Sequence, residues 1–437
     1  MSTKDKVLIQ IASYNTNLQG SKGVPQDLVD WLSPTLQVSS FLSHSPRGPD
    51  VVAVGFQELL PLHLGLSGAS KSVIDQRCSH ILSQIEAHSP QKEKYTLLAK
   101  IVNAGVALIL YARDDGIARK VCDVQTSWTG CGPLYMGNKG AVGVRFRVSE
   151  NETDLGETYT FVCAHLTAHQ QNLKHRIADF HHIVGSLLFP PLPSSEDKSP
   201  STMYSTSHLF FLGDLNFRVA LPDDHPLFRN PSAHVLEALR EQDTRETLKE
   251  FDQLLVERRK RSIFVGLREG EFWQFKCSYK YRLNAVDHYD SKRVPSWTDR
   301  IMYATYTDSP DELEKSHITN LLYTTVPSYT TSDHKPIVAL LLVPSRIQGD
   351  SASSTSAVAT TTTIPTIALP EFYTPRPDPR ATLKRYTGRT LDRIVGVCWW
   401  LFTLLGAGSA LLGVFNFVVG ASAYRWWKSS QSSPASV

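Results

Sequence analysis

The stretch His208-Leu209-Phe210-Phe211-Leu212-Gly213-Asp214-Leu215-Asn216-Phe217-Arg218 joins a short apolar run to a glycine and then to three polar side chains at alternating positions. The apolar run is typical of a buried β-strand. Because side chains of an extended chain alternate between two faces, Asp214, Asn216 and Arg218 would share one face. They would then gather at the carboxyl end of the strand, where open α/β sheets hold their ligands. The same residues are also typical of a tight turn with a solvent-exposed arginine. The rest of the sequence is needed to choose between a ligand-binding strand end and such a turn.

The overall composition is that of a globular protein. The chain has 437 residues, of which 41% are hydrophobic and 20% charged, and its net charge is only +3. This length allows one large catalytic domain with accessory segments, and this charge gives no reason to expect a nucleic-acid partner. The six cysteines form no CxxC pair, and the first ten residues hold no long apolar segment. We therefore expect reduced thiols, no structural zinc and no secretory signal.

Apolar runs that end in a polar residue recur along the chain. Residues 6–17 predict a strand that ends in Asn15 and Asn17, and residues 50–58 predict a strand that ends in Glu58. Further strands are expected over 141–148, 158–165 and the end of 332–343, a hairpin over 95–112, and helices over 72–87, 172–188, 232–239 and 244–261. A proline- and serine-rich insert over 190–207 is expected to be a mobile loop. The alternation predicts an α/β or layered α+β domain over residues 1–344.

The polar residues at these strand ends suit a hard cation and a phosphate. They are Asn15, Glu58, Asp214 with Asn216, and Asp333 with His334. Mg²⁺ prefers oxygen ligands and keeps several waters, so one or two carboxylates together with substrate oxygens are sufficient. One carboxylate at a strand end is more often a cap or a surface group. The recurrence of the pattern is what favours a metal and phosphate site.

The C-terminal part of the chain has a different composition. Residues 345–379 are rich in Ser, Thr, Ala and Pro and a basic stretch follows, so we expect a disordered linker over residues 345–393. Residues 394–424 contain no charged residue and are long enough to cross a bilayer. We expect a transmembrane anchor there, single-pass or hairpin, followed by a short polar tail over residues 425–437.

The charges beside this segment predict its orientation. Six Arg and Lys residues over 376–393 precede it and two follow it. By the positive-inside rule this leaves the catalytic domain in the cytosol. The short tail fits the endoplasmic reticulum best, by analogy with tail-anchored proteins.

Seven motifs occur in the order found in inositol polyphosphate 5-phosphatases, and over residues 5–343 the chain resembles that family. The motifs are Phe56-Gln57-Glu58, Asn138-Lys139-Gly140-Ala141-Val142, Ala164-His165-Leu166-Thr167-Ala168-His169, Gly213-Asp214-Leu215-Asn216-Phe217-Arg218, Tyr279-Lys280-Tyr281, Pro295-Ser296-Trp297-Thr298-Asp299-Arg300-Ile301 and Ser332-Asp333-His334-Lys335-Pro336. The resemblance implies the endonuclease/exonuclease/phosphatase fold, which is DNase I-like. That fold is an α+β four-layer sandwich of two packed mixed β-sheets flanked by helices. The resemblance also implies Mg²⁺-dependent removal of an inositol 5-phosphate.

The resemblance further implies a role for each matching residue. Its catalytic set is Asp214, Asn216, His334, Asp299 and His165. In this set Asp214 orients or deprotonates the attacking water, Asn216 holds the transition state, and His334 contacts the phosphate. Asp299 orients His334, and His165 donates to a phosphate oxygen. The implied metal ligand is Glu58, with Asn15 and Asp333 beside the metal, and the implied substrate-binding set is Asn138, Lys139, Tyr279, Lys280 and Arg293.

The expected substrate is a phosphoinositide such as phosphatidylinositol 4,5-bisphosphate, attacked in line by water at a membrane surface. The 3,4,5-trisphosphate lipid and soluble inositol polyphosphates are further candidates, and no protein partner can be inferred. Two alternatives stay open: another phosphodiesterase of the same superfamily, either a neutral sphingomyelinase or a nuclease, and an inactive membrane-tethered phosphoinositide-binding module. Tyr279, Lys280 and Arg293 favour a substrate with a second phosphate, because a fixed lysine and arginine can bind one. Cys277 stands where the family often has proline, which leaves the geometry of that pocket open.

Overall fold

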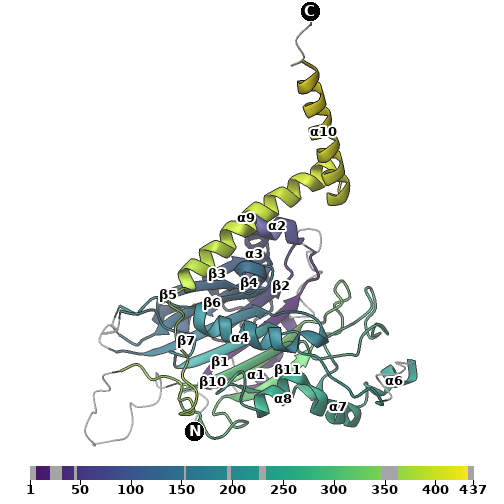
Figure 1. Ribbon diagram of the computed structural model, residues 1–437. Helices are drawn as coiled ribbons and strands as arrows, with labels where there is room; N and C mark the ends of the chain where they lie inside the picture. The colour runs from purple at the N-terminus through teal and green to yellow at the C-terminus, as the bar shows by residue number, and fades with distance from the viewer. Residues whose placement is uncertain are drawn as a thin grey trace, which may run out of the picture.

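Two mixed β-sheets form the centre of the molecule (Figure 1). The computed structural model describes residues 6–19, 32–43, 47–151, 154–193, 198–225, 233–345 and 363–431. The first sheet has the order β11-β12-β1-β2-β4-β3 and consists of β1 (Lys6–Asn15), β2 (Val51–Gln57), β3 (Tyr95–Asn103), β4 (Val106–Arg113), β11 (Thr319–Thr325) and β12 (Ile337–Pro344). The second has the order β5-β6-β7-β8-β10-β9 and consists of β5 (Val121–Gly130), β6 (Gly140–Val148), β7 (Glu157–His165), β8 (His208–Asp214), β9 (Arg268–Glu269) and β10 (Asp299–Thr305).

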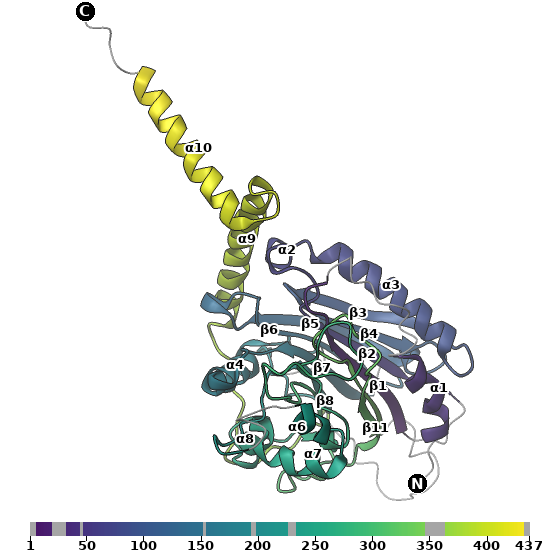
Figure 2. The same cartoon turned by 90° about the vertical axis from the view of Figure 1, so that its right-hand side faces the viewer.

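Helices cover the outer faces of both sheets (Figure 2). Helices α1 (Ser33–Leu42) and α3 (Ser70–His88) lie against the first sheet, and α4 (Leu173–Ser186) and α8 (Gln253–Arg259) lie against the second. The remaining helices are α2 (Leu62–Ser67), α6 (Ala233–Ala238), α7 (Gln242–Leu248), α9 (Ala381–Leu405) and α10 (Ala410–Gln431). The predicted four-layer sandwich of two packed mixed sheets flanked by helices is therefore confirmed.

Apolar side chains fill both the space between the sheets and the space beneath the helices. On β8, Leu212 belongs to the cluster between the sheets, whereas its neighbour Phe211 packs under Phe180 of α4. On β2, Val54 packs on the opposite face, with Ile81 of α3. Strands buried on both faces have continuous apolar sequences, and these apolar runs predicted β1, β2, β7 and β8.

The strands that the sequence pattern missed are β5, β9 and β11 at the edges of the sheets and β10, which lies inside the second sheet between β8 and β9. β5 is an edge strand of the second sheet and β11 an edge strand of the first, and both are only partly buried over most of their length. An edge strand buries less apolar surface and carries more polar residues, so the apolar pattern that predicts a strand is weak there. The short helices α1 and α2 were missed as well.

The insert expected to be a mobile loop packs against the domain at its C-terminal end. Met203 and Tyr204 are buried in the cluster beneath α4. The Ser207 hydroxyl donates to the Pro365 carbonyl oxygen at 2.7 Å, and the Ile367 amide donates to the Thr206 carbonyl oxygen at 2.9 Å. Residues 198–207 and 363–367 thus pack together on the domain surface.

The structure also differs from the expected linker over residues 345–393. Residues 346–362 lie outside the described residues, but residues 363–380 run along the domain and α9 begins at Ala381. Figure 1 shows α9 lying beside α2 before α10 extends away from the domain. The first half of α9 is therefore an ordered part of the chain where a disordered segment was expected.

The expected transmembrane segment is divided between two helices. Among the described helices, none alone is long and apolar enough to cross a membrane. Helices α9 and α10 reach that length and hydropathy only as a pair, which bends by 81° at the break between them. Large apolar side chains on both helices are exposed, among them Leu404, Leu411 and Phe415.

Candidate active site

The register of the second sheet aligns the predicted residues at one end of four neighbouring strands. His165 on β7 lies beside Asp214 on the parallel strand β8, and Asp214 lies opposite Asp299 on the antiparallel strand β10. On the other side of His165 is Gly140 of β6, which directly follows Lys139. One row across the sheet therefore brings together residues that are up to 160 positions apart in the chain.

The first sheet contributes side chains that face this row. Asn15 ends β1 and lies beside Gln57 on the parallel strand β2, so Glu58 is the first residue after β2. The Asn15 carboxamide Nδ2 donates to Asp214 Oδ2 at 2.9 Å and so connects the two sheets. Glu58 has a φ of +49°, a left-handed conformation at the point where its carboxylate leaves the strand.

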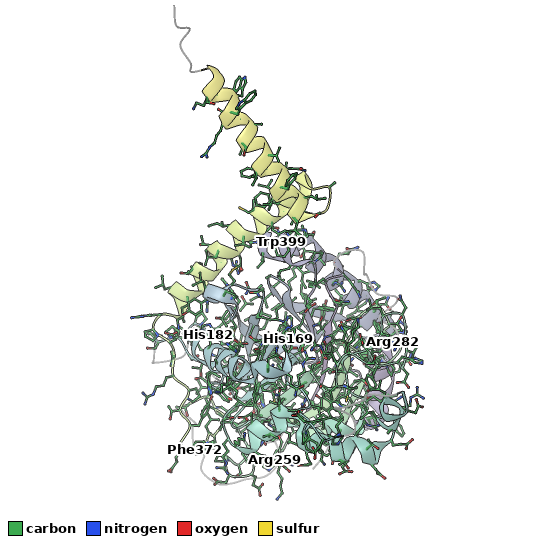
Figure 3. All side chains as sticks on the ribbon, turned by 45° about the vertical axis from the view of Figure 1, so that its right-hand side comes forward. His169, His182, Arg259, Arg282, Phe372 and Trp399 are labelled. Atoms are coloured by element: carbon green, nitrogen blue, oxygen red, sulfur yellow. The ribbon has the colours of Figure 1, made fainter. Side chains whose placement is uncertain are left out.

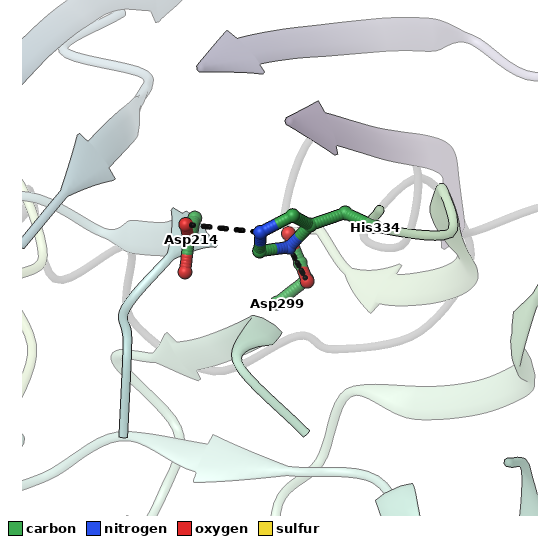
Figure 4. A group of neighbouring side chains, drawn as sticks. All are labelled: Asp214, Asp299 and His334. Atoms are coloured by element: carbon green, nitrogen blue, oxygen red, sulfur yellow. Dashed lines mark hydrogen bonds and ion pairs between the residues drawn. The ribbon is translucent and has the colours of Figure 1, made fainter. Parts of the chain in front are cut away.

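His334 lies between two carboxylates (Figure 4). Its Nδ1 is 2.9 Å from Asp299 Oδ2, and its Nε2 is 3.9 Å from Asp214 Oδ2. The Ser332 hydroxyl accepts a hydrogen bond from the His334 amide at 3.1 Å and donates to the Asn15 carbonyl oxygen at 2.8 Å. The loop that precedes β12 is in this way held to the end of β1.

The charges in this cluster determine its protonation. Burial by itself lowers the pKa of His334, but the carboxylates of Asp299 and Asp214 outweigh burial and raise that pKa to about 9. Burial likewise favours the protonated form of Asp214, and here the positive charge of His334, with His165 and Lys139, holds the pKa well below its usual range. At neutral pH the cluster therefore contains an imidazolium ion beside an ionised Asp214.

Lys139 and His165 bring donors to the other side of Asp214. The Lys139 ammonium group contacts the His165 ring, and His165 Nε2 lies 3.3 Å from Asp214 Oδ2 and 3.8 Å from Glu58 Oε1. Burial lowers the pKa of Lys139, whereas the carboxylates of Asp214 and Glu58 raise it. This arrangement places cationic or donating groups on both sides of one buried carboxylate.

The chain after β8 does not stay extended, which corrects the prediction that Asp214, Asn216 and Arg218 share a strand face. Asn216 has a φ of +57°, and its Nδ2 donates to the Leu166 carbonyl oxygen at 3.1 Å. Gly213 is required because its φ is +136° and a Cβ there would lie 2.0 Å from the Ala164 carbonyl oxygen. The glycine allows β8 to approach β7 closely just before Asp214.

Arg218, which the sequence interpretation left out, has two contacts inside the site. Its guanidinium group hydrogen-bonds the Asn216 carboxamide oxygen and lies over the Tyr279 ring, 4.1 Å from the centroid. The first contact fixes which way the Asn216 amide faces. The Tyr279 ring in turn lies 4.5 Å from the His334 ring, centroid to centroid.

The predicted contacts to a second phosphate lie next to the cluster. Tyr279 and Arg293 line a cavity of about 40 Å³ together with Arg218 and His169. Lys280 forms an ion pair with Asp333 at 2.6 Å. Asp333, predicted to lie beside the metal, thus contacts a predicted substrate residue in this structure. The structure places it in the same loop as His334.

Asn138 is the predicted residue that the structure brings least into the cluster. Its Oδ1 lies close to Gly132 in its own loop, and that buried atom has no hydrogen-bond partner among the described residues. Its neighbour Lys139, by contrast, reaches His165.

Two hydroxyl groups that sequence reasoning missed support Asp299. Ser278 Oγ and Thr298 Oγ1 donate to Asp299 Oδ2 at 2.7 Å and 2.9 Å. This oxygen also faces His334, so the two donors fix the carboxylate that orients the imidazole. The signal available in the sequence was position alone: Thr298 directly precedes Asp299 within a quoted motif, and Ser278 directly precedes the motif that begins at Tyr279.

The donor set suits a divalent cation. Glu58 presents a partly exposed carboxylate with a side-chain exposure of 31%, and its Oε1 faces the same His165 nitrogen that contacts Asp214 Oδ2. These are hard oxygen ligands of the kind that Mg²⁺ and Ca²⁺ prefer. Asp214, Asp299 and His334 are also close enough to one another to hold an ion. His334 already hydrogen-bonds Asp299 at 2.9 Å and forms an ion pair with Asp214 at 3.9 Å, so Glu58 is the partly exposed carboxylate that could hold a metal.

Comparison with known proteins agrees with this geometry. The model of the Endonuclease/Exonuclease/phosphatase family 2 matches residues 12–340, which include every residue of the cluster. The chain belongs to the Endonuclease/Exonuclease/phosphatase family 2. Within this family, the rat protein synaptojanin-2 is 30% identical over 365 residues, which cover 77% of this chain and 22% of that protein. The chain thus spans about a fifth of the length of the synaptojanin that it matches.

Two further relatives are smaller proteins or isolated domains. Type I inositol polyphosphate 5-phosphatase 8 of Arabidopsis thaliana is 28% identical over 378 residues, with 76% of this chain and 70% of that protein covered. Among solved structures, the inositol polyphosphate 5-phosphatase domain of SPsynaptojanin was crystallised with inositol (1,4)-bisphosphate and a calcium ion. It matches with a TM-score of 0.59 and 25% identity, over 77% of this chain and 84% of that domain. The calcium ion of that structure is a divalent cation, which agrees with the carboxylates present in this site.

Proposed function

We propose that this protein is an Mg²⁺-dependent phosphatase that removes the 5-phosphate from phosphoinositides such as phosphatidylinositol 4,5-bisphosphate. The observation that carries the proposal is the row of Lys139, His165, Asp214 and Asp299 at one end of the second sheet, with Glu58 and His334 facing it. Relatives that are named inositol polyphosphate 5-phosphatases support the choice of substrate.

In the proposed reaction Asp214 orients the attacking water. Because His334, His165 and Lys139 hold the pKa of Asp214 well below its usual range, this carboxylate is a weak base. It accepts a hydrogen bond from the water and sets the direction of attack, while Asn15 and the Asn216 amide N–H fix its two oxygens at 2.9 Å and 3.1 Å. A role in positioning the water is therefore favoured over full deprotonation.

The positively charged side chains would stabilise the phosphoryl group. Phosphoryl transfer depends on positioning and on positive charge around the equatorial oxygens more than on covalent catalysis. The His334 imidazolium and the Lys139 ammonium group supply such charge from two sides of Asp214. A metal bound at Glu58 and Asn15 would supply Lewis-acid polarisation of the same phosphate.

The cavity beside the cluster favours a substrate with a second phosphate. Arg293 and Arg218 line this cavity together with Tyr279. Lys280 directly follows Tyr279 in the chain. We propose that these cations bind the 4-phosphate, as the sequence interpretation expected for Tyr279, Lys280 and Arg293. A choline phosphodiester has no such group, so the cavity argues against a sphingomyelinase.

A substrate panel tests the proposed function. We expect the full chain, purified in detergent, to release phosphate from phosphatidylinositol 4,5-bisphosphate and to yield the 4-phosphate lipid, with EDTA abolishing release and Mg²⁺ restoring it. Glu58→Gln is expected to raise the Mg²⁺ concentration needed for half-maximal rate by about 10- to 100-fold. The same panel should include the 3,4,5-trisphosphate lipid, soluble inositol 1,4,5-trisphosphate, sphingomyelin and abasic DNA. Turnover of only the last two, or of none, would overturn the proposal.

We also propose that the apolar segment 394–424 holds the protein on a membrane with the catalytic domain in the cytosol, and that this membrane is the endoplasmic reticulum. The exposed apolar side chains on α9 and α10 and the basic residues that precede them support this.

Deleting residues 398–437 is expected to move the protein from the membrane pellet to the supernatant, because the apolar surface is lost. Deleting only residues 425–437 is the control and should leave it in the pellet. A 398–437 deletion that still sediments with membranes would contradict the anchor.

A further inference from the structure

The N-terminal half of α9 is docked closely against the catalytic domain. A Cβ on Gly388 would lie 1.9 Å from the Tyr135 carbonyl oxygen, and a Cβ on Gly396 would lie 2.3 Å from the Ser67 amide nitrogen. Two glycines two turns apart on one helix face thus allow backbone contact with two different segments of the domain. Figure 3 shows Trp399, one turn further on, where α9 leaves the domain surface, and its ring lies 5.9 Å from that of His63.

Between these glycines α9 places a buried carboxylate on the domain. Asp392 is only 4% exposed, and both of its oxygens accept the Gly137 amide N–H, at 2.9 Å and 3.1 Å. Burial raises the pKa of Asp392 to about 6, against the opposing effect of Gly137, Arg389 and Arg393. The group is therefore ionised at neutral pH, and a charged acceptor makes a stronger hydrogen bond than a neutral one.

The hydrogen bond to Asp392 restrains the loop that carries Lys139. This loop folds back on itself: the Gly132 amide donates to the Met136 carbonyl oxygen at 2.9 Å, and the Cys131 amide donates to the Lys139 carbonyl oxygen at 2.7 Å. Gly137 lies two residues before Lys139, whose ammonium group contacts His165 in the cluster. Moving Gly137 would therefore move Lys139.

The same turn of α9 also contacts the segment behind Glu58. Arg389 donates to Asn103 Oδ1 at 3.4 Å, in the turn between β3 and β4. The Gly105 carbonyl oxygen in that turn accepts the Leu59 amide N–H at 3.0 Å, directly after Glu58. Helix α9 thus contacts the loop that carries Lys139 and the end of β3, whose following turn is hydrogen-bonded to the residue after Glu58.

We propose that Asp392 is a positioning residue, which holds Lys139 in place for the substrate phosphate through the Gly137 amide. This inference rests on the proposed function, because it assigns Lys139 to the phosphate. The docked part of α9, residues 381–396, then belongs to the catalytic unit, whereas the sequence had predicted a linker up to residue 393 and the start of the transmembrane segment after it.

Steady-state kinetics of the full chain in detergent, with soluble inositol 1,4,5-trisphosphate and Mg²⁺, test this role. Asp392→Ala is expected to lower kcat/KM by about tenfold. Asp392→Asn should stay within threefold of the wild type, because its carboxamide oxygen still accepts the Gly137 N–H. The exposed Thr390, on the same helix, provides the control: Thr390→Ala should leave kcat/KM unchanged.

A double-mutant cycle and hydrogen exchange separate positioning from a general structural role. In a Lys139→Ala background, Asp392→Ala should lower kcat/KM by less than a further twofold, because the group that it positions is gone. Amide exchange over residues 132–139 should accelerate at least tenfold in Asp392→Ala, while exchange in β7 and β8 stays as in the wild type.

Three results would overturn the inference: wild-type kinetics in Asp392→Ala, an undiminished tenfold loss in the Lys139→Ala background, or exchange that accelerates over the whole sheet. If Asp392→Ala does not fold, the same kinetics and hydrogen exchange are measured on Gly388→Ala, whose added Cβ would clash with Tyr135 in the same loop. Loss of the fold in both variants counts against a positioning role. If the wild type releases no phosphate from any substrate, the proposed function fails, while the exchange experiment still tests the contact.

Discussion

Asp214→Asn is expected to lower kcat by about 10⁴-fold, with a much smaller change in KM. The substitution removes the charge that orients the water and leaves an amide where His165, His334 and Asn15 all present donors. A 10⁴-fold loss corresponds to about 5 kcal/mol of transition-state stabilisation. Single-turnover phosphate release from phosphatidylinositol 4,5-bisphosphate in mixed micelles measures it.

The matched control for this variant is Asp308→Asn. Asp308 is also a buried carboxylate, 3% exposed, but it follows the opposite end of β10, where it accepts the Thr305 amide at 3.0 Å. We expect a lower melting temperature and an unchanged kcat. Equal losses in the two variants, or an Asp214→Asn enzyme within tenfold of the wild type, would refute the role of Asp214.

How much of this site could be predicted depends on which interactions fix each residue. Asp214 ends and Glu58 follows a strand that is buried on both faces, and the apolar run of such a strand is visible in a single sequence. The pattern of polar residues beside strands also included His334, and the family motifs added His165 and Asp299. The alignment of these residues in one row follows from strand register, which no local pattern specifies.

The errors came from interactions between distant parts of the chain. Asn216 leaves the extended conformation because its side chain is held by Leu166 and Arg218, and a two-residue period contains no information about those partners. The start of α9 has the composition of a basic linker, yet its two glycines and Asp392 fit loops 250 residues or more earlier in the chain. Composition alone therefore did not predict that the start of α9 is a helix docked on the domain.

His334→Gln is expected to lower kcat by about 10²- to 10³-fold, because it removes the imidazolium that faces Asp214. Glutamine can still donate a hydrogen bond, but it carries no charge. With a pKa raised to about 9 by Asp299 and Asp214, the histidine is cationic at neutral pH, so the variant loses a full positive charge beside the phosphate.

Asp299→Asn should lower kcat by less, about 10- to 100-fold, since it weakens the partner of His334 and leaves the imidazole in place. Rates on phosphatidylinositol 4,5-bisphosphate at pH 7 compare the two variants directly.

His208→Gln is the control for the loss of a buried histidine. His208 lies at the other end of β8 from Asp214, pairs with Glu157 at 3.5 Å and is fully buried. Because it lies far along the strand from the cluster, we expect it to change stability and leave kcat within twofold of the wild type. If Asp299→Asn lost as much activity as His334→Gln, the carboxylate would have to act on the substrate itself. If His334→Gln kept more than a tenth of the wild-type rate, the phosphate would not depend on the imidazolium, and Lys139 would be left as the main source of positive charge beside Asp214.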